Sequence, residues 1–393
     1  MLGTIIVREI QEYIKSKKFL IGLFITVALI VLSTIINVRD YARRQQEYLT
    51  VSQKKESIMP RIYRPPQVLS VLARGKDTKF GNLITLIPGS IEATTNGYMD
   101  RALSHSKRLK SGLTAIDYNF VVKVVLSLMV IFFGYSSISG EKASGSLKQV
   151  FSNSLARDKL LVGKFIGGLI VIIISLVIAT LITLIIIQFH SAVKLNTSDW
   201  IRIILMLGVS ALYLTVFYTL SMFISVTISR PSTALMVLMQ IWLFLLFIYP
   251  SVGVCIAKKW YHVPSEKEIR LHIGQIAKNI YGKYGGSRII QFDSKIHEKV
   301  EDIPLGEYAI SKYNIERNFE NALNSQSEFS QKITFVSPAV LYDRIMERLA
   351  RTGTAELEMF FSNVLPYFRT LYRENLFFSQ TITPGGIISS GGT

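Results

Sequence analysis

The chain has 393 residues, of which 49% are hydrophobic and only 18% are charged, and its mean hydropathy is +0.35. Soluble domains carry about 25% charged residues, so this composition excludes an ordinary cytosolic enzyme and indicates a membrane protein. In a membrane protein, the formal net charge of +17 is interpreted first as a signal of membrane topology and only then as a sign of nucleic-acid binding. The single cysteine, Cys255, excludes a multi-cysteine zinc site.

The first predicted element, residues 1–18, contains an amphipathic helix. Ile5 and Ile10 fall on one face with other apolar residues at helical spacing, whereas Arg8 and Glu9 fall on the polar face. A helix of this kind lies flat at the membrane interface. It is either a plain juxtamembrane helix or a contact surface for a cytoplasmic partner.

Five stretches are long and apolar enough to cross the hydrocarbon core of a bilayer, which takes roughly 20 residues of helix. Each must be helical, because hydrocarbon offers no partner to unpaired backbone groups. The sequence therefore predicts an all-α membrane protein with five transmembrane helices. These spans are residues 19–38, 120–138, 160–187, 203–228 and 234–256.

Lys and Arg concentrate in the N-terminal segment, in the loop between the second and third spans, and in the turn after the fourth. The positive-inside rule places these short segments in the cytoplasm. We therefore expect a multi-pass protein of the cell membrane (plasma or inner) with a cytoplasmic N-terminus.

The same orientation puts two long, largely helical regions outside, residues 39–119 and 258–380, followed by a flexible tail at 381–393. In the second region Ser337 and Pro338 precede apolar residues at helical spacing, which predicts a helix with Pro338 in its first turn.

Residues 139–159 form a charged elbow between the second and third spans. Gly140 and Gly145 break the helix, and a short amphipathic piece containing Leu147 follows. The two glycines have the spacing of a phosphate-binding loop, but Ser146 replaces its essential lysine, so we expect no ATP hydrolysis by this chain. A compact elbow of this kind can instead dock into a groove on another protein.

The third span begins with Gly163 and Gly167, four residues apart, which favours close helix packing. Lys164, near the helix end, is expected to snorkel to the interface. At the outer end of the second span, Lys123 is expected to pair with Asp117.

Hydroxyl and aromatic side chains are frequent in the fourth and fifth spans. They serve either as interhelical hydrogen bonds or as the weakly polar wall of a substrate path. No Asp or Glu lies near the middle of a span, so the relay of a proton-coupled transporter is missing, and no metal or nucleophile motif is present. The candidate path residues are Tyr213, Thr215, Tyr218, Thr219 and Gln240.

Several motifs resemble the permease subunits of type-2 ABC exporters, in particular the subgroup with large extracytoplasmic regions. They are Arg8-Glu9 before the first span, Gly140-Glu141-Lys142 in the elbow, and Arg157, Lys159 and Gly163-Lys164 around the start of the third span. The resemblance covers nearly the whole chain. Such permeases usually have six spans, whereas five are found here.

The resemblance implies two protein partners. A separate cytoplasmic ABC ATPase would supply ATP and Mg²⁺, while this chain would hold no cofactor and act as the export permease. A second permease subunit, identical or different, would complete the transport path. The protein would also contact membrane lipids, and no nucleic-acid partner is expected. The elbow residues expected to couple to the ATPase are Gly140, Glu141, Lys142, Gly145, Leu147 and Arg157.

The main alternative comes from a different class of protein. The chain would be a non-transporting membrane anchor or sensor whose outer region binds an envelope partner or ligand. In that case the elbow could be altered without functional loss.

Overall fold

A computed structural model describes residues 2–53, 61–75, 83–85, 116–152, 156–283 and 303–353, together with residues 356 and 359. The predicted tail, 381–393, lies outside the described residues. Among those described, five helices are long and apolar enough to cross a membrane, and they coincide with the predicted spans. The all-α membrane architecture is confirmed. These helices are Lys17–Thr50, Tyr118–Ser144, Arg157–Gln188, Thr197–Thr227 and Pro231–Trp260.

The chain starts with α1 (Leu2–Lys15) and continues into the long α2 (Lys17–Gln53). Ser16 makes the break between them. Its hydroxyl donates to the carbonyl of Tyr13 at 2.8 Å and accepts the backbone N–H of Phe19 at 3.2 Å, so one residue ends α1 and caps α2.

The second span is a composite helix. It consists of α5 (Tyr118–Phe120), the π-helical η3 (Val121–Leu126) and α6 (Ser127–Gly134). The elbow follows as α7 (Ser139–Ser144) and α8 (Ser146–Ser152). Asp117 caps the composite helix, because its Oδ1 accepts the backbone N–H of Phe120 at 2.7 Å.

The remaining spans follow through short connections. A capping box of Asn196 and Asp199 starts the fourth, and Pro231 lies in the first turn of the fifth. The helices are α9 (Arg157–Gln188), α10 (Thr197–Thr227), α11 (Pro231–Leu243), the π-helical η4 (Phe244–Ile248) and α12 (Tyr249–Trp260).

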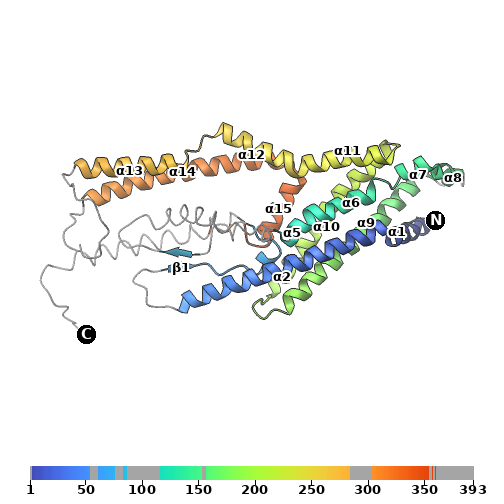
Figure 1. Ribbon diagram of the computed structural model, residues 1–393, viewed down its shortest axis with the longest axis horizontal. Helices are drawn as coiled ribbons and strands as arrows, with labels where there is room; N and C mark the ends of the chain where they lie inside the picture. Colours follow the sequence, from blue (N-terminus) through green and yellow to red (C-terminus); the bar gives the residue numbers. More distant parts are fainter. Residues whose placement is uncertain are drawn as a thin grey trace.

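The two ends of the bundle differ in what they carry (Figure 1). At one end lie α1, α7 and α8. From the other end α13 (Glu266–Lys283) and α14 (Ile303–Thr334) project side by side. The same end holds η1 (Val68–Val71) and an antiparallel pair of three-residue strands, β1 (Arg61–Tyr63) and β2 (Leu83–Thr85).

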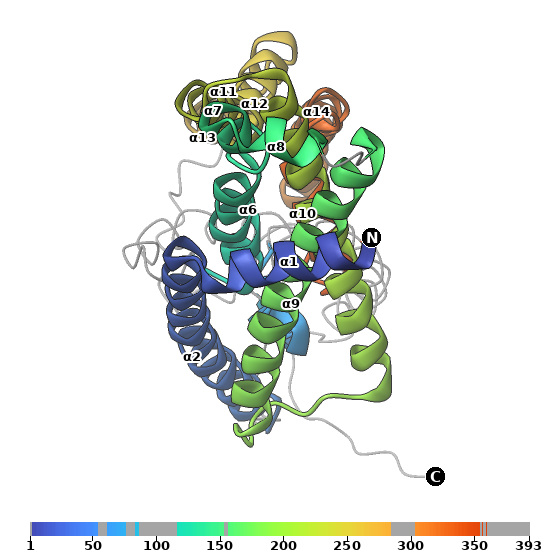
Figure 2. The ribbon, with the colours of Figure 1, turned by 90° about the vertical axis from the view of Figure 1, so that its right-hand side faces the viewer.

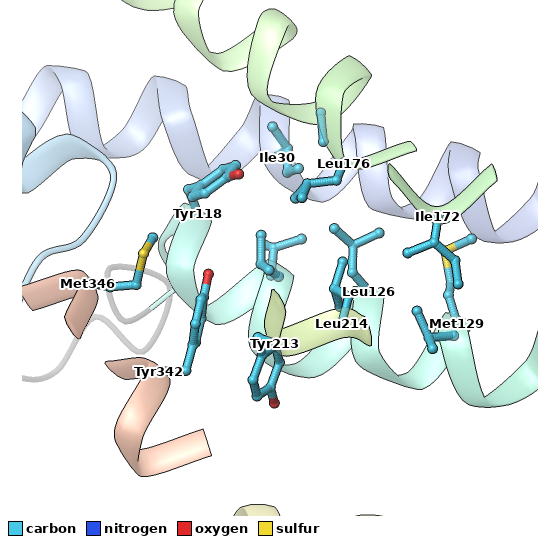
Figure 3. Close-up of a cluster of buried hydrophobic side chains, with 14 of the residues drawn as sticks. Ile30, Tyr118, Leu126, Met129, Ile172, Leu176, Tyr213, Leu214, Tyr342 and Met346 are labelled. Atoms are coloured by element: carbon cyan, nitrogen blue, oxygen red, sulfur yellow. The ribbon is translucent and has the colours of Figure 1, made fainter. Parts of the chain in front are cut away.

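Helix α15 (Pro338–Leu349) brings the chain back to the bundle. It begins as predicted, with Ser337 at the N-cap and Pro338 in the first turn. Its Tyr342 is buried, stacks on Tyr213 of α10 with ring centroids 4.5 Å apart, and shares a 2.9 Å hydrogen bond with Ser210 (Figure 3). The far end of the bundle is therefore closed by a helix from the last region of the chain.

Candidate functional site

Helix α1 lies across α9 at its end of the bundle (Figure 2). Two glycines of α9 allow the backbone of α1 to approach α9 closely. A Cβ atom on Gly163 would lie 2.7 Å from Cγ2 of Ile5, and one on Gly167 would lie 2.9 Å from Cβ of Glu9. The helix that packs on the predicted small-residue positions is thus α1.

A buried ion cluster joins three elements at this contact. Nζ of Lys164 on α9 lies 2.9 Å from Oε2 of Glu9 on α1 and 2.9 Å from Oε1 of Glu141 on α7. The side chains of Lys164 and Glu9 are only 5% and 8% exposed. We call Glu9, Glu141 and Lys164 the inner triad.

The inner triad corrects two expectations. Lys164 does not snorkel to the interface, and Glu9 does not lie on the exposed face of α1. Both turn inward because each supplies the opposite charge that the other needs once it is removed from water. Neither partner is visible in the local sequence of the other.

The electrostatics of the inner triad are unbalanced. Burial raises the pKa of the Glu9 carboxyl above its ordinary value, and the Lys164 ammonium counteracts that rise. Two carboxylates share one ammonium, and among the described residues Oε2 of Glu141 has no hydrogen-bond partner. When both carboxylates are ionised, the inner triad has a net charge of −1.

Further hydrogen bonds attach the elbow to α10. The hydroxyl of Ser225 accepts the backbone N–H groups of Ile138 and Ser139 at 3.1 and 3.0 Å, and Nζ of Lys142 donates to the carbonyl of Val226. The elbow is therefore bonded directly to α9 and α10, and Lys164 links it to α1.

Gly145 separates the two short helices of the elbow. Its φ of +76° lies in the left-handed region, where a side chain is strained. Of the other predicted coupling residues, Gly140 and Leu147 are half-buried, and Arg157 is exposed at the start of α9.

A comparison with models of known protein families shows which family the chain belongs to. The model described as ABC-2 family transporter protein matches residues 4–380, which include the inner triad, the elbow and α15. The chain belongs to the ABC-2 transporter family. It is a multi-pass membrane permease, and a comparison with curated proteins finds no match.

The five candidate path residues of the permease do not share one wall. Tyr213 and Tyr218 are buried within the chain, where their hydroxyls donate to the carbonyls of Lys123 and Lys164. Thr215 and Thr219 bond to carbonyls of their own helix, and Gln240 on α11 is exposed. The two tyrosines thus form interhelical hydrogen bonds in this structure.

At the far end of the permease, Lys123 has a different partner from the one expected. Its Nζ lies 2.7 Å from Oδ2 of Asp343 on α15, and Asn119 donates to Oδ1 of the same residue at 2.8 Å. Asp117 instead accepts backbone N–H groups of Arg74 and Phe120. We call Lys123 and Asp343 the outer pair.

Proposed function

We propose that the chain is the export permease of an ABC transporter and that a separate cytoplasmic ATPase drives it through the elbow. Family membership supports a transport role and, in general, an ATPase partner. The sequence contains no phosphate-binding loop of its own. The proposed N-terminus-in orientation rests on the basic residues near α1 and the elbow.

The inner triad is the observation that carries the proposal. A force applied to α7 reaches α9 and α1 through Lys164 and reaches α10 through Ser225. Because Lys164 and Ser225 are both buried, the elements that they join are expected to move together instead of sliding past each other. A protein that grips the elbow would thus move two spans and the interfacial helix at once.

A second permease subunit fits the exposure of the fifth span. Only 11% of its most apolar window is buried inside the chain, against 61% for the second span. Lipid or another subunit must cover that surface. We infer that a second copy or a related chain covers part of it and completes the transport path.

The test is purification of the full chain from its native membrane, with the ATP hydrolysis of co-purifying subunits as the readout. Ala143→Glu places a charge on an exposed part of the elbow and is expected to reduce the retained ATPase activity by roughly tenfold or more, as for a carboxylate forced into a packed contact. Lys194→Glu, exposed at the opposite end between α9 and α10, is the matched control and should retain activity.

If no ATPase co-purifies, or if both variants retain equal activity, the elbow is not the site through which the ATPase drives the permease. An anchor or sensor would give that second result, because its elbow has no partner.

A further inference from the structure

A cavity of about 490 Å³ lies where α1 turns into α2, against α6 and α7. Its buried side is formed by the inner triad, and its exposed side includes Lys17 and Lys18. Tyr13, Phe132 and Phe133 add aromatic walls, and the hydroxyls of Ser136 and Ser137 add polar ones. The cavity combines charges of both signs with apolar surface.

The two charged sides are each incompletely paired. On the buried side, two carboxylates share the single ammonium of Lys164, and Oε2 of Glu141 accepts no hydrogen bond within the described chain. On the exposed side, no carboxylate of the described residues pairs with Lys17 or Lys18. Lys18 instead donates to the hydroxyl of Tyr135 at 2.9 Å. A ligand with a cation at its tip and an anion behind it would complement both sides.

The location of the cavity suggests where such a ligand comes from. Lys17 begins the first span, and the residues that follow it on α2 are apolar and exposed: Leu20, Ile21 and Phe24 are 54%, 60% and 74% exposed. Phe132 extends this apolar surface on α6. A molecule whose headgroup enters the cavity can therefore lay hydrocarbon chains along α2.

We propose that this cavity binds the headgroup of an aminophospholipid, such as phosphatidylethanolamine. The primary ammonium points to Glu141 and the inner triad, and the phosphate lies between Lys17 and Lys18. A primary ammonium donates hydrogen bonds that a trimethylammonium lacks, and phosphatidylglycerol has no cation at all. The proposal concerns a lipid site and does not depend on the identity of the ATPase or on export.

The test is native mass spectrometry of the purified full chain titrated with phosphatidylethanolamine, phosphatidylcholine and phosphatidylglycerol of matched acyl chains. We expect phosphatidylethanolamine to bind roughly tenfold more tightly than the other two, and the double variant Lys17→Gln/Lys18→Gln to weaken its binding by roughly thirtyfold, because two basic residues are lost. Lys258→Gln/Lys259→Gln, an exposed lysine pair at the end of α12, is the matched control and should change nothing.

Glu141→Gln should reduce the preference for phosphatidylethanolamine over phosphatidylglycerol. Because that variant disturbs the inner triad, Glu12→Gln on the exposed part of the cavity wall serves as a second variant and should reduce the same preference more weakly.

Equal binding of all three lipids would overturn the proposal, as would unchanged binding in the lysine double variant, because both indicate only general lipid contact. Soluble phosphoethanolamine binding as tightly as the lipid would also overturn it, since the chains would then contribute nothing. No ATPase is present in this assay, so its failure is distinct from failure of the elbow mechanism.

Discussion

The two ends of the bundle use ion pairs differently. In the inner triad, the side chains of Lys164 and Glu9 are 5% and 8% exposed and that of Glu141 is 27% exposed, whereas in the outer pair Lys123 and Asp343 are 23% and 30% exposed. Water screens the outer pair and stays near either charge when the pair opens. In the inner triad, Lys164 and Glu9 are shielded from water and depend on each other for a charged partner. We therefore expect the inner end to respond as a unit and the outer end to tolerate local change.

The largest expected effect comes from removing the shared cation. Lys164→Met leaves the buried carboxylate of Glu9 and the half-buried carboxylate of Glu141 without a partner and should lower the free energy of unfolding by about 3–5 kcal/mol. Lys123→Met, the matched change at the outer pair, should cost about 1 kcal/mol or less. Chemical denaturation in detergent measures both. Equal losses would mean that the two ends do not differ in the way their burial indicates.

A smaller effect is expected where α1 crosses α9. Gly167→Ala places a methyl group 2.9 Å from Cβ of Glu9 and should cost about 1–3 kcal/mol, because a close-packed contact has to open. The same change at Gly208 on α10, where an added Cβ meets nothing within 4 Å, should not destabilise the protein. Unfolding curves and the protease sensitivity of α1 report the difference. An unchanged Gly167→Ala protein would show that α1 is loosely placed.

At the same end of the bundle, the backbone conformation of Gly145 in the elbow can also be tested. Gly145→Ala must adopt a left-handed conformation and should cost about 1–2 kcal/mol. Asn tolerates this conformation better, so Gly145→Asn should recover most of the loss. Thermal unfolding of the two variants checks the order. If Ala and Asn behaved alike, the turn between α7 and α8 would not be fixed at this residue.

The smallest effect is expected at the outer end. Tyr342→Phe removes the hydroxyl that shares a hydrogen bond with Ser210 but retains the ring stacked on Tyr213, and should cost about 1 kcal/mol. Denaturant titration is again the measurement. A loss as large as that of Lys164→Met would place the most sensitive contact at α15 instead of at the inner triad.

Local pattern was enough to predict the spans, the amphipathic N-terminal helix and the start of α15. Apolar length determines a span, and Ser337 with Pro338 forms a helix start within four residues. The inner triad could not be predicted in this way, because Lys164 and Glu9 are 155 positions apart. A lysine at a helix end is expected to reach water unless a buried carboxylate from another element is known.

The outer pair shows the same limit. Asp117 is six positions from Lys123 and was the natural partner by distance along the chain. Asp343, 220 positions away, takes that place because α15 returns to the bundle. One signal was available for the inner site: Lys164 lies between Gly163 and Gly167, on a helix face that another helix can approach closely.

The most direct test of the coupling role separates folding from transmission. The triple variant Glu9→Gln/Lys164→Met/Glu141→Gln removes all three charges together, and neutral replacement of a buried ion cluster typically preserves the fold. Its unfolding midpoint and its co-purified ATPase activity would be measured in one preparation. We predict a folded permease that still binds the ATPase but no longer alters its hydrolysis rate. A folded triple variant with unchanged coupling would contradict the claim that force passes through Lys164.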